Sequence, residues 1–366
     1  MFLQNLRLYN FKNYEELSLD LGKHMYCFFG NNGSGKTNLL DAIYYLSFTK
    51  SSISASDSFV VRKDQHQFLV KGVFESEGRT AEVVCSSVNG KKTVQVDGQG
   101  YQKFSDHLGR FPVVLVAPQD IELIWDGSEL RRKFFDSLIS QLDKNYLDYL
   151  IVYTHQLKQR NSFLRMTAEA GRGLDRDLLD SYDHRLMAAG SYLFQKRKEF
   201  LATFLPIFHT HYHFLSDGAK EKVSIEYESD LHHIDFGTLL KKNREKDILL
   251  QRTTSGIHRD DFFFSLDGSD LKRTGSQGQQ KSFLIGLKLT EFQIIAENKQ
   301  TKPILLLDDI FDKLDDQRIH KLMQLVAKGN FGQIFLTDAR PARSEEILIN
   351  AGLQATMYRV ENGQIR

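Results

Sequence analysis

Gly30-Asn31-Asn32-Gly33-Ser34-Gly35-Lys36-Thr37 decides the fold of this chain of 366 residues. The stretch satisfies the pattern G-x-x-x-x-G-K-[ST] in full, which is typical of loops that bind nucleotide phosphates. Its glycines let backbone N–H groups curl around the phosphates, and the lysine reaches the β and γ phosphates. The final hydroxyl ligates Mg²⁺. We therefore predict that this stretch, the P-loop, binds ATP, that Lys36 also serves catalysis and that Thr37 holds Mg²⁺.

The residues on either side of the P-loop suit this interpretation. His24 to Phe29 is a nearly continuous apolar run, which predicts a strand buried on both faces. From Lys36 to Leu46 the apolar residues follow helical spacing, so a helix would point its positive end at the phosphates. The alternative is a glycine turn with a coincidental lysine. The strand before it and the helix after it favour a phosphate site.

A second apolar run, Ile304 to Leu307, ends in Asp308-Asp309. Acids at the carboxyl end of a strand lie where ligands bind in an open α/β sheet. We predict that Asp308 holds Mg²⁺ through water, opposite Thr37, and that Asp309 orients or deprotonates the attacking water. The alternative is a pair of acids that begins a loop.

The signature segment, Ser276-Gln277-Gly278-Gln279-Gln280, precedes a predicted helix that runs to about Ala296. By itself it is consistent with an ordinary helix capped by Ser276. Its position between the P-loop and the acidic strand resembles the motif order of ABC-type ATPases. That resemblance implies that Ser276, Gly278 and Gln279 close over the γ-phosphate in a second copy of the chain, so we expect a dimer. Leu314-Asp315 resembles the D-loop of the same class.

The chain divides into two regions by pattern. Residues 1–126 and 251–366 carry the strand-like and nucleotide-binding segments, including a hairpin signal at Asn89-Gly90, and we predict an α/β head from them. Residues 127–250 predict a helical lobe. Within it one helix is expected in residues 129–166, which lack Pro and Gly, and another from 174 to 204, ending at Pro206.

Composition is that of an ordinary globular protein. The 48 basic and 47 acidic residues give a net charge of +1, so global charge does not indicate a nucleic-acid partner. No apolar run reaches the roughly 20 residues of a membrane-spanning helix, and the first ten residues resemble no signal peptide. We expect a soluble cytoplasmic protein without a membrane partner, with Cys27 and Cys85 as buried free thiols.

Taken together, the motifs resemble the RecF family of bacterial recombinational repair proteins, in order and over nearly the whole chain. The segments that carry this resemblance are Leu6 to Tyr14, Asn32 to Ile43, Glu129 to Asp136, Gly256 to Asp261, Gly275 to Gln280 and Leu305 to Asp315. The resemblance implies an α/β fold, namely an ABC-type (SMC-like) P-loop ATPase head with an inserted helical lobe. It also implies that Asn38 belongs to the ATP site.

The resemblance further implies a function. Such proteins form an ATP-dependent homodimer, bind DNA at single-strand gap junctions regardless of sequence, and act with RecO and RecR to load RecA. Their slow, DNA-stimulated ATP hydrolysis triggers release. Lys and Arg side chains would contact the phosphates of the DNA. The first candidates are Arg131, Arg132 and Lys133, and the next are Lys158, Arg160, Arg165 and the cluster Lys196-Arg197-Lys198. For each basic cluster the alternative is a solvated helix face.

Several positions depart from the family pattern or allow two interpretations. Asp309 stands where many ABC-type ATPases have Glu, and its shorter side chain fits slow turnover. Thr337-Asp338 stands where many relatives place a switch histidine, so the resemblance does not identify the residue that senses the γ-phosphate. Gln119 is either a residue that contacts Mg²⁺ or the attacking water and serves catalysis, or a plain loop glutamine. His258 and Arg259 either contact the nucleotide or the partner copy, or His258 packs inside the lobe against Asp260.

Three other functions remain possible from the residues. A P-loop small-molecule kinase would need an arginine-rich lid and no signature segment. A different ABC-type subunit, such as a transporter ATPase, would pair with a membrane protein. A nucleotide-locked scaffold would bind ATP without hydrolysing it. The size of residues 127–250 and the resemblance along the whole chain favour the repair ATPase.

Overall fold

The computed structural model describes the whole chain except residues 55, 171–172, 217–220 and 314–315. Its contacts divide the chain into two compact units. The first comprises Met1–Ile121, His211–Gly218 and Gln277–Arg366, and the second comprises Glu122–Thr210 and Ala219–Ser276. This division differs from the predicted one in three segments: 122–126 and 251–276 group with the second unit, and 211–218 groups with the first.

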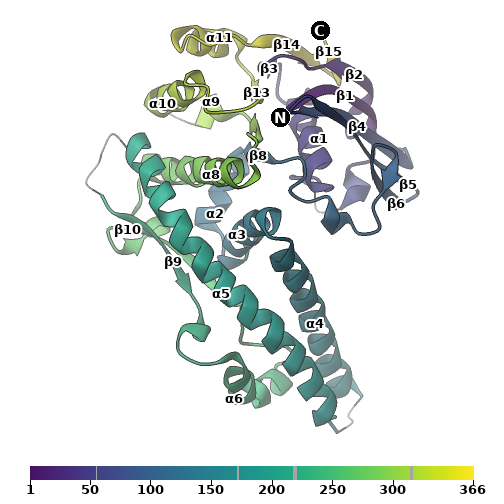
Figure 1. Ribbon diagram of the computed structural model, residues 1–366, viewed down its shortest axis with the longest axis vertical. Helices are drawn as coiled ribbons and strands as arrows, with labels where there is room; N and C mark the ends of the chain where they lie inside the picture. Colours follow the sequence, from purple (N-terminus) through teal and green to yellow (C-terminus); the bar gives the residue numbers. More distant parts are fainter. Residues whose placement is uncertain (55, 171–172, 217–220, 314–315) are drawn as a thin grey trace. The chain divides into compact units, whose positions relative to one another are not determined.

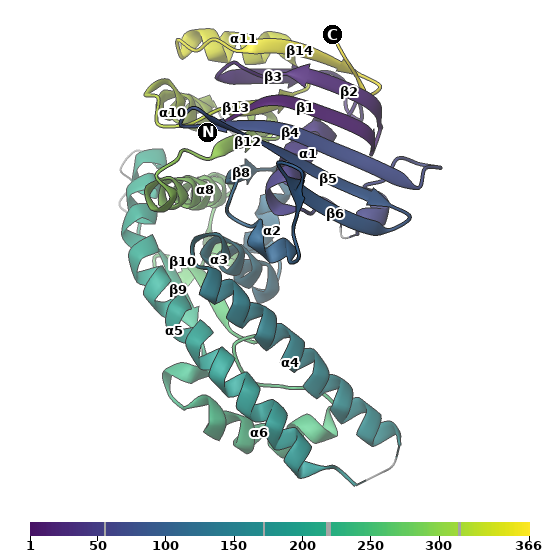
Figure 2. The ribbon, with the colours of Figure 1, turned by 45° about the vertical axis from the view of Figure 1, so that its right-hand side comes forward.

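The first unit contains an antiparallel sheet of strand order β2-β1-β4-β5-β6-β7. Figure 2 shows β1, β4, β5 and β6 side by side. Their bounds are β1 Phe2–Phe11, β2 Tyr14–Asp20, β4 Gln67–Ser76, β5 Arg79–Val88, β6 Lys91–Val96 and β7 Gln99–Gly100. The turn between β5 and β6 is Asn89-Gly90, and both residues have positive φ, 49° and 78°. The predicted hairpin is therefore confirmed, because these two residues tolerate that conformation.

A second sheet of the first unit, of order β15-β14-β3-β13-β12-β8, is parallel except for β15. Its strands are β3 Met25–Phe29, β8 Val113–Val116, β12 Ile304–Leu307, β13 Ile334–Asp338, β14 Thr356–Glu361 and β15 Gln364–Ile365. The central strands β12 and β13 are buried along their whole length, which explains their continuous apolar runs. Because the parallel strands share a direction, their carboxyl ends lie at one edge.

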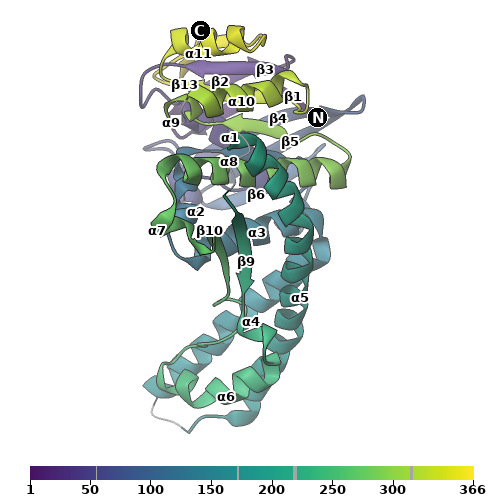
Figure 3. The same cartoon turned by 90° about the vertical axis from the view of Figure 1, so that its left-hand side faces the viewer.

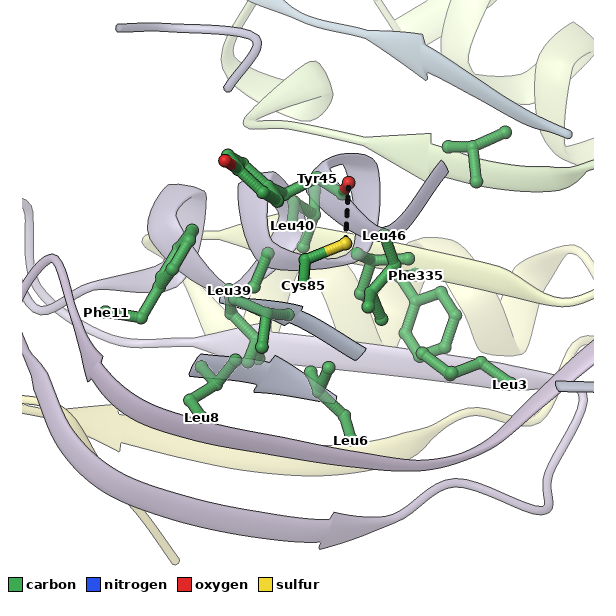
Figure 4. Close-up of a cluster of buried hydrophobic side chains, with 14 of the residues drawn as sticks. Leu3, Leu6, Leu8, Phe11, Leu39, Leu40, Tyr45, Leu46, Cys85 and Phe335 are labelled. Atoms are coloured by element: carbon green, nitrogen blue, oxygen red, sulfur yellow. Dashed lines mark hydrogen bonds between the residues drawn. The ribbon is translucent and has the colours of Figure 1, made fainter. Parts of the chain in front are cut away.

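Helix α1, Lys36–Phe48, packs between the two sheets (Figure 4). Side chains from β1, α1, β5 and β13 meet in one apolar cluster that includes Leu6, Leu46, Cys85 and Phe335. The predicted burial of both thiols is confirmed, and burial raises the pKa of Cys27 and of Cys85 to about 12. The other helical segments of this unit are η1 Asp57–Phe59, η2 Phe104–Asp106, η3 Pro118–Ile121, α8 Gln277–Lys299, α9 Ile310–Lys313, α10 Asp316–Ala327 and α11 Pro341–Asn350.

The second unit is mainly helical. Its helices are α2 Glu122–Trp125, α3 Ser128–Leu142, α4 Lys144–Glu169, α5 Arg176–Leu215, η4 Asp230–His232, α6 Phe236–Leu249 and α7 Leu271–Thr274. The end of α5, from His211 on, groups with the first unit. Helices α4 and α5 run alongside each other, and the rings of Tyr149 and Tyr192 stack between them at 4.2 Å (Figure 1). A small antiparallel sheet, with β9 Val223–Glu228, β10 Asp261–Leu266 and β11 Ser269–Asp270, was predicted only at β10.

Two predicted helix boundaries in this region are wrong. The helix expected over residues 129–166 is divided at Asp143, whose side chain accepts a hydrogen bond from Tyr146 N and so begins α4. Helix α5 does not end at Pro206 but continues to Leu215 (Figure 3). A proline inside a helix removes one hydrogen-bond donor and costs stability, which tertiary packing can offset. Here the flanking Phe204 and Phe208 are fully buried.

We predict that Leu46→Ala lowers the free energy of unfolding by about 2–5 kcal/mol, because it leaves a cavity between α1 and the sheets. Leu46 is fully buried. Urea unfolding followed by circular dichroism measures the change. Ile349→Ala is the control, because that side chain is 66% exposed and its removal should cost less than about 0.5 kcal/mol. Equal losses in the two variants would contradict the packing of α1.

Candidate nucleotide-binding site

Three loops meet at the carboxyl edge of the parallel sheet. The P-loop follows β3, Asp308-Asp309 follows β12, and Thr337-Asp338 ends β13. A pocket of about 180 Å³ lies there. Its lining residues are Asn32, Gly33, Gly35, Lys36, Thr37, Asn38, Asp309 and Thr337. Segments nearly 300 residues apart in the sequence therefore form one polar pocket, as the two motifs predicted.

Close packing explains why two positions of the P-loop must be glycine. A Cβ atom at Gly30 would lie 2.3 Å from the carbonyl oxygen of Val360. A Cβ atom at Gly35 would lie 2.4 Å from Nδ2 of Asn13, and Gly35 also has a φ of 117°, which side chains rarely adopt. Any other residue would push the loop away from its neighbours.

Lys36 is buried within its own loop. Its Nζ donates to the carbonyl oxygens of Gly30 at 2.7 Å and Asn31 at 3.0 Å. Burial lowers the pKa of Lys36, while the nearby carboxylates of Asp309 and Asp308 oppose this effect. A phosphate in the pocket would supply the full negative charge that these neutral carbonyl oxygens lack.

The carboxylate of Asp308 is the meeting point of two threonine hydroxyls. Thr37 Oγ1 donates to its Oδ1 at 3.0 Å, and Thr337 Oγ1 donates to the same oxygen at 2.7 Å. Burial raises the pKa of Asp308. Mg²⁺ favours such oxygen ligands and usually takes one or two carboxylates together with phosphates and water. In the part of the chain that the structure describes, no group of three or more His, Cys, Asp or Glu side chains could hold a metal. Thr37 and Asp308 thus fit Mg²⁺ bound together with a nucleotide.

Asp309 and Thr337 complete this side of the pocket. Asp309 adopts a φ of 48°, a left-handed conformation that Asp tolerates better than most residues, and its N–H donates to Thr337 Oγ1 at 2.9 Å. Asp338 instead points away from the lining: it is buried and accepts hydrogen bonds from Ser344 Oγ and from Ala339 N. Of the two residues at the expected switch position, only Thr337 lines the pocket.

The turn between β1 and β2 braces the P-loop, which the sequence analysis did not predict. Asn13 Nδ2 donates to the carbonyl of Ser34 at 3.1 Å, and Asn38 Nδ2 donates to Asn13 Oδ1 at 2.7 Å. The hydroxyl of Tyr14 donates to the carbonyl of Gly35 at 3.0 Å. Asn38 therefore has a structural partner besides lining the pocket. Asn13 and Tyr14 lie in a segment that carried the family resemblance, but nothing in its pattern indicated their contacts.

Comparison with known proteins agrees with this geometry. The family described as "RecF/RecN/SMC N terminal domain" matches residues 2–364. The DNA replication and repair protein RecF of Flavobacterium johnsoniae is 45% identical over 349 residues, which cover 95% of this chain and 97% of that protein. The RecF of Cytophaga hutchinsonii is 44% identical and covers all of this chain and 96% of its own length. The chain belongs to the RecF family.

Solved RecF structures also match over nearly the full length. The ATP form of the recombination mediator protein RecF of the RecFOR pathway has a TM-score of 0.89 at 30% identity, covering 100% of this chain and 97% of that one. A head domain of Smc, at 15% identity and a TM-score of 0.56, shares the fold. The predicted ABC-type, SMC-like α/β fold is therefore confirmed. No helix among the described residues is long and apolar enough to cross a membrane.

The signature segment of this RecF family member lies at the beginning of α8. Ser276 is exposed, and Gly278 and Gln279 are partly exposed. A Cβ atom at Gly278 would lie 2.9 Å from Arg318 Nη2, so the helix and this arginine approach closely. No residue of α8 lines the pocket within the described part of the chain, and neither does Gln119, which is exposed in η3. Leu314-Asp315 lies outside the described residues.

The basic residues predicted to contact DNA differ in what their side chains do. Arg131 donates to both carboxylate oxygens of Asp261, at 2.8 and 2.7 Å, and only 12% of its side chain is exposed. Arg132 donates to Ser128 Oγ at 2.6 Å and to the carbonyl of Asp260. Lys133 is 66% exposed and pairs with Glu129 on the helix surface. Of the three, Lys133 is the most accessible to a phosphate.

Two further candidates are corrected by the structure. Arg160 is fully buried and pairs with Asp183 at 2.7 Å and Asp247 at 2.8 Å. Arg197 is also buried and pairs with Asp136 at 2.9 Å. Neither guanidinium group can reach DNA, because each is enclosed among the helices of the second unit. Lys158 and Arg165, on the same helix as Arg160, are exposed.

His258 packs inside the second unit, but not against Asp260. Its Nδ1 lies 2.8 Å from the hydroxyl of Tyr153, and its Nε2 lies 3.2 Å from the carbonyl of Thr253. Burial lowers the pKa of His258 to about 4. Asp260 instead accepts from Tyr227 and faces Arg197. The packing alternative for His258 is thus the one that the contacts support.

We predict that Asn13→Ala weakens ATP binding about 3- to 30-fold, because one to two hydrogen bonds that position the P-loop are lost. Equilibrium titration with a fluorescent ATP analogue measures the affinity. The matched control is Asn5→Ala on the preceding strand β1, whose amide donates to Leu19 and Asp20. Unchanged affinity in Asn13→Ala would show that the turn does not position the loop.

We predict that the second unit loses stability as pH falls from about 6.5 to about 4, in part through His258. The folded pKa lies below the ordinary value of 6.5, so the unfolded chain binds the proton more tightly in this range. Fluorescence of Trp125, the single tryptophan, follows unfolding of this unit. His258→Gln should reduce the loss, and His184→Gln, at an exposed position, should not. Identical pH profiles for wild type and His258→Gln would contradict this role.

Proposed function

We propose that this protein is a DNA repair ATPase that binds ATP with Mg²⁺, dimerises on it and hydrolyses it slowly. One observation carries the proposal: Lys36, Thr37 and Asp309 line one pocket at the carboxyl edge of the parallel sheet, and Asp308 accepts a hydrogen bond from Thr37 beside it. These are the groups that phosphate binding, metal binding and activation of water require. Membership of the RecF family supplies the link to DNA replication and repair.

Each group has a defined task in this proposal. The backbone N–H groups of the P-loop and the ammonium of Lys36 hold the β and γ phosphates. Thr37 and Asp308 hold Mg²⁺, which when bound neutralises charge that develops on the phosphates. Asp309 orients the attacking water and accepts its proton. Its carboxylate is one methylene shorter than that of Glu, which fits slow turnover.

A second copy of the chain completes the site in our proposal. Gly278 and Gln279 belong to the first unit but do not line its nucleotide pocket, and Ser276 belongs to the second unit. All three lie at the beginning of α8, a helix of 23 residues. The free N–H groups at such a helix end favour a phosphate. The nucleotide would therefore hold two copies together, and hydrolysis would release them.

The dimer would bind DNA through phosphates, at junctions of single-stranded gaps and without reading sequence. Lys133, Lys158 and Arg165 are the exposed basic residues of the second unit that we favour for these contacts. Solved relatives are described as recombination mediators of the RecFOR pathway. On this basis we propose that the protein acts in the cytoplasm with RecO and RecR, and through them helps to load RecA.

ATP is expected to double the mass of the wild-type protein in solution, and the doubled species should retain gapped DNA. Lys36→Arg should prevent doubling because it misplaces the phosphate contact, and Ser276→Arg because it blocks the partner's site. Ser269→Arg, at another exposed serine, is the matched control and should behave as wild type. Light scattering after size-exclusion chromatography measures the mass.

Two results would contradict the proposal. A protein that stays monomeric with both ATP and DNA bound excludes a site shared between copies. Doubling without any phosphate release, in the presence of DNA and Mg²⁺, leaves a nucleotide-locked scaffold instead of an ATPase.

A further inference from the structure

A buried group of three charges lies in the first unit, outside the lining of the nucleotide pocket. The Nζ atom of Lys288, in the middle of α8, lies 3.4 Å from Asp120 Oδ1 and 3.4 Å from Glu291 Oε2. The exposed fractions of the three side chains are 11%, 18% and 10%. One ammonium group therefore serves two carboxylates away from bulk water, where electrostatic attraction is strong and an unpaired charge is costly.

These three residues connect different elements. Asp120 belongs to η3, directly after β8, and its Oδ2 accepts a hydrogen bond from the N–H of Ala117 at 2.8 Å. The same carboxylate thus closes the turn of η3 and pairs with α8. Tyr44, on helix α1, lies near these carboxylates. Burial raises the pKa of Tyr44, and the charges of Glu291, Asp41 and Asp120 raise it further.

The connected elements all carry parts of the nucleotide site. Helix α1 begins with Lys36 and Thr37, α8 begins with the signature segment, and η3 lies beside β12 and Asp308. A pocket of about 230 Å³ between η3 and α8 is lined by Asp120, Lys281, Lys288 and Asp308 together with apolar side chains. The ion pair of Lys288 with Asp120 is a polar link between η3 and α8 at this pocket.

Lys288 is too far along α8 to touch a nucleotide at the helix N-terminus. It lies 11 residues after Gln277, which corresponds to roughly 16 Å along the helix axis. Its effect on the site must therefore act through the position of the whole helix. A helix is stiff over this length, so holding its middle also sets the direction of its first turn.

We propose that Lys288 is a positioning residue that fixes α8 to η3, so that the signature segment and the Asp308 edge of the site keep one relative position. This inference rests on the proposed function, in which the signature segment binds a nucleotide held by another copy. Without the link the P-loop would still bind ATP, because its own contacts are untouched. Dimerisation on ATP, and hydrolysis that needs the partner's signature segment, would fail.

Substitution of Lys288 alone leaves two buried carboxylates facing each other and can prevent folding. The decisive variant is therefore Lys288→Met/Asp120→Asn/Glu291→Gln, which removes all three charges with little change in shape. We expect it to bind the fluorescent ATP analogue within about threefold of wild type, while the dimer fraction and turnover fall at least tenfold. Lys288→Arg keeps the positive charge, so this variant should show at least half of the wild-type dimer fraction and at least half of the wild-type turnover.

Lys71→Met is the matched control. Lys71 pairs with Glu82 at 2.6 Å between β4 and β5, and its loss should change neither dimerisation nor turnover. Melting temperatures without nucleotide show whether each variant is folded. A purely structural role would lower the melting temperature and reduce ATP binding and turnover together.

Three results would overturn the inference: a folded triple variant with wild-type dimerisation and turnover, a parallel loss of ATP binding, or no recovery in Lys288→Arg. Failure of the proposed function looks different, because the wild-type protein itself would then not double its mass with ATP. In that event the turnover of the triple variant still tests the positioning role of Lys288. Turnover equal to that of wild type overturns the inference. A tenfold loss of turnover with unchanged ATP binding supports it.

Discussion

One carboxylate oxygen organises the candidate nucleotide site. Oδ1 of Asp308 accepts hydrogen bonds from Thr37, at the beginning of α1, and from Thr337, at the end of β13. These bonds join β12 to two other segments of the parallel sheet edge, and the same Thr337 oxygen accepts from the N–H of Asp309. Because the carboxylate is buried, its charge is costly unless neighbours or a cation compensate it. The need to satisfy this one group brings the P-loop, the acidic strand and the switch position together.

The antiparallel sheet has a functional consequence beyond forming a core. Its first turn supplies Asn13 and Tyr14, which hold the carbonyl groups of Ser34 and Gly35. The apolar core between the two sheets holds α1 in place (Figure 4). The P-loop, which leads directly into α1, therefore has little conformational freedom. A preorganised loop binds phosphate without first losing conformational entropy. Packing and binding are therefore two results of the same arrangement.

The second unit uses much of its positive charge internally. Arg160 and Arg197 are enclosed by the aspartates of neighbouring helices, and Arg131 pairs with Asp261. A buried guanidinium group with several partners fixes helix positions, because moving any helix would leave a charge unpaired. The basic run Arg131-Arg132-Lys133 therefore combines an arginine that pairs with Asp261 and a lysine that is exposed. Only exposed basic residues are available to the DNA contacts that we propose.

The P-loop, the acidic strand and the fold class could be predicted from the sequence, because each depends on consecutive residues whose spacing has a direct physical meaning. A glycine-rich loop between a buried strand and a helix is recognisable without knowledge of its neighbours. The tertiary structure alone decided the brace by Asn13, the burial of Arg160, the partner of His258 and the passage of α5 through Pro206. Each of these depends on contacts with residues distant in the chain, and local propensity is outweighed when such contacts bury charge or apolar surface.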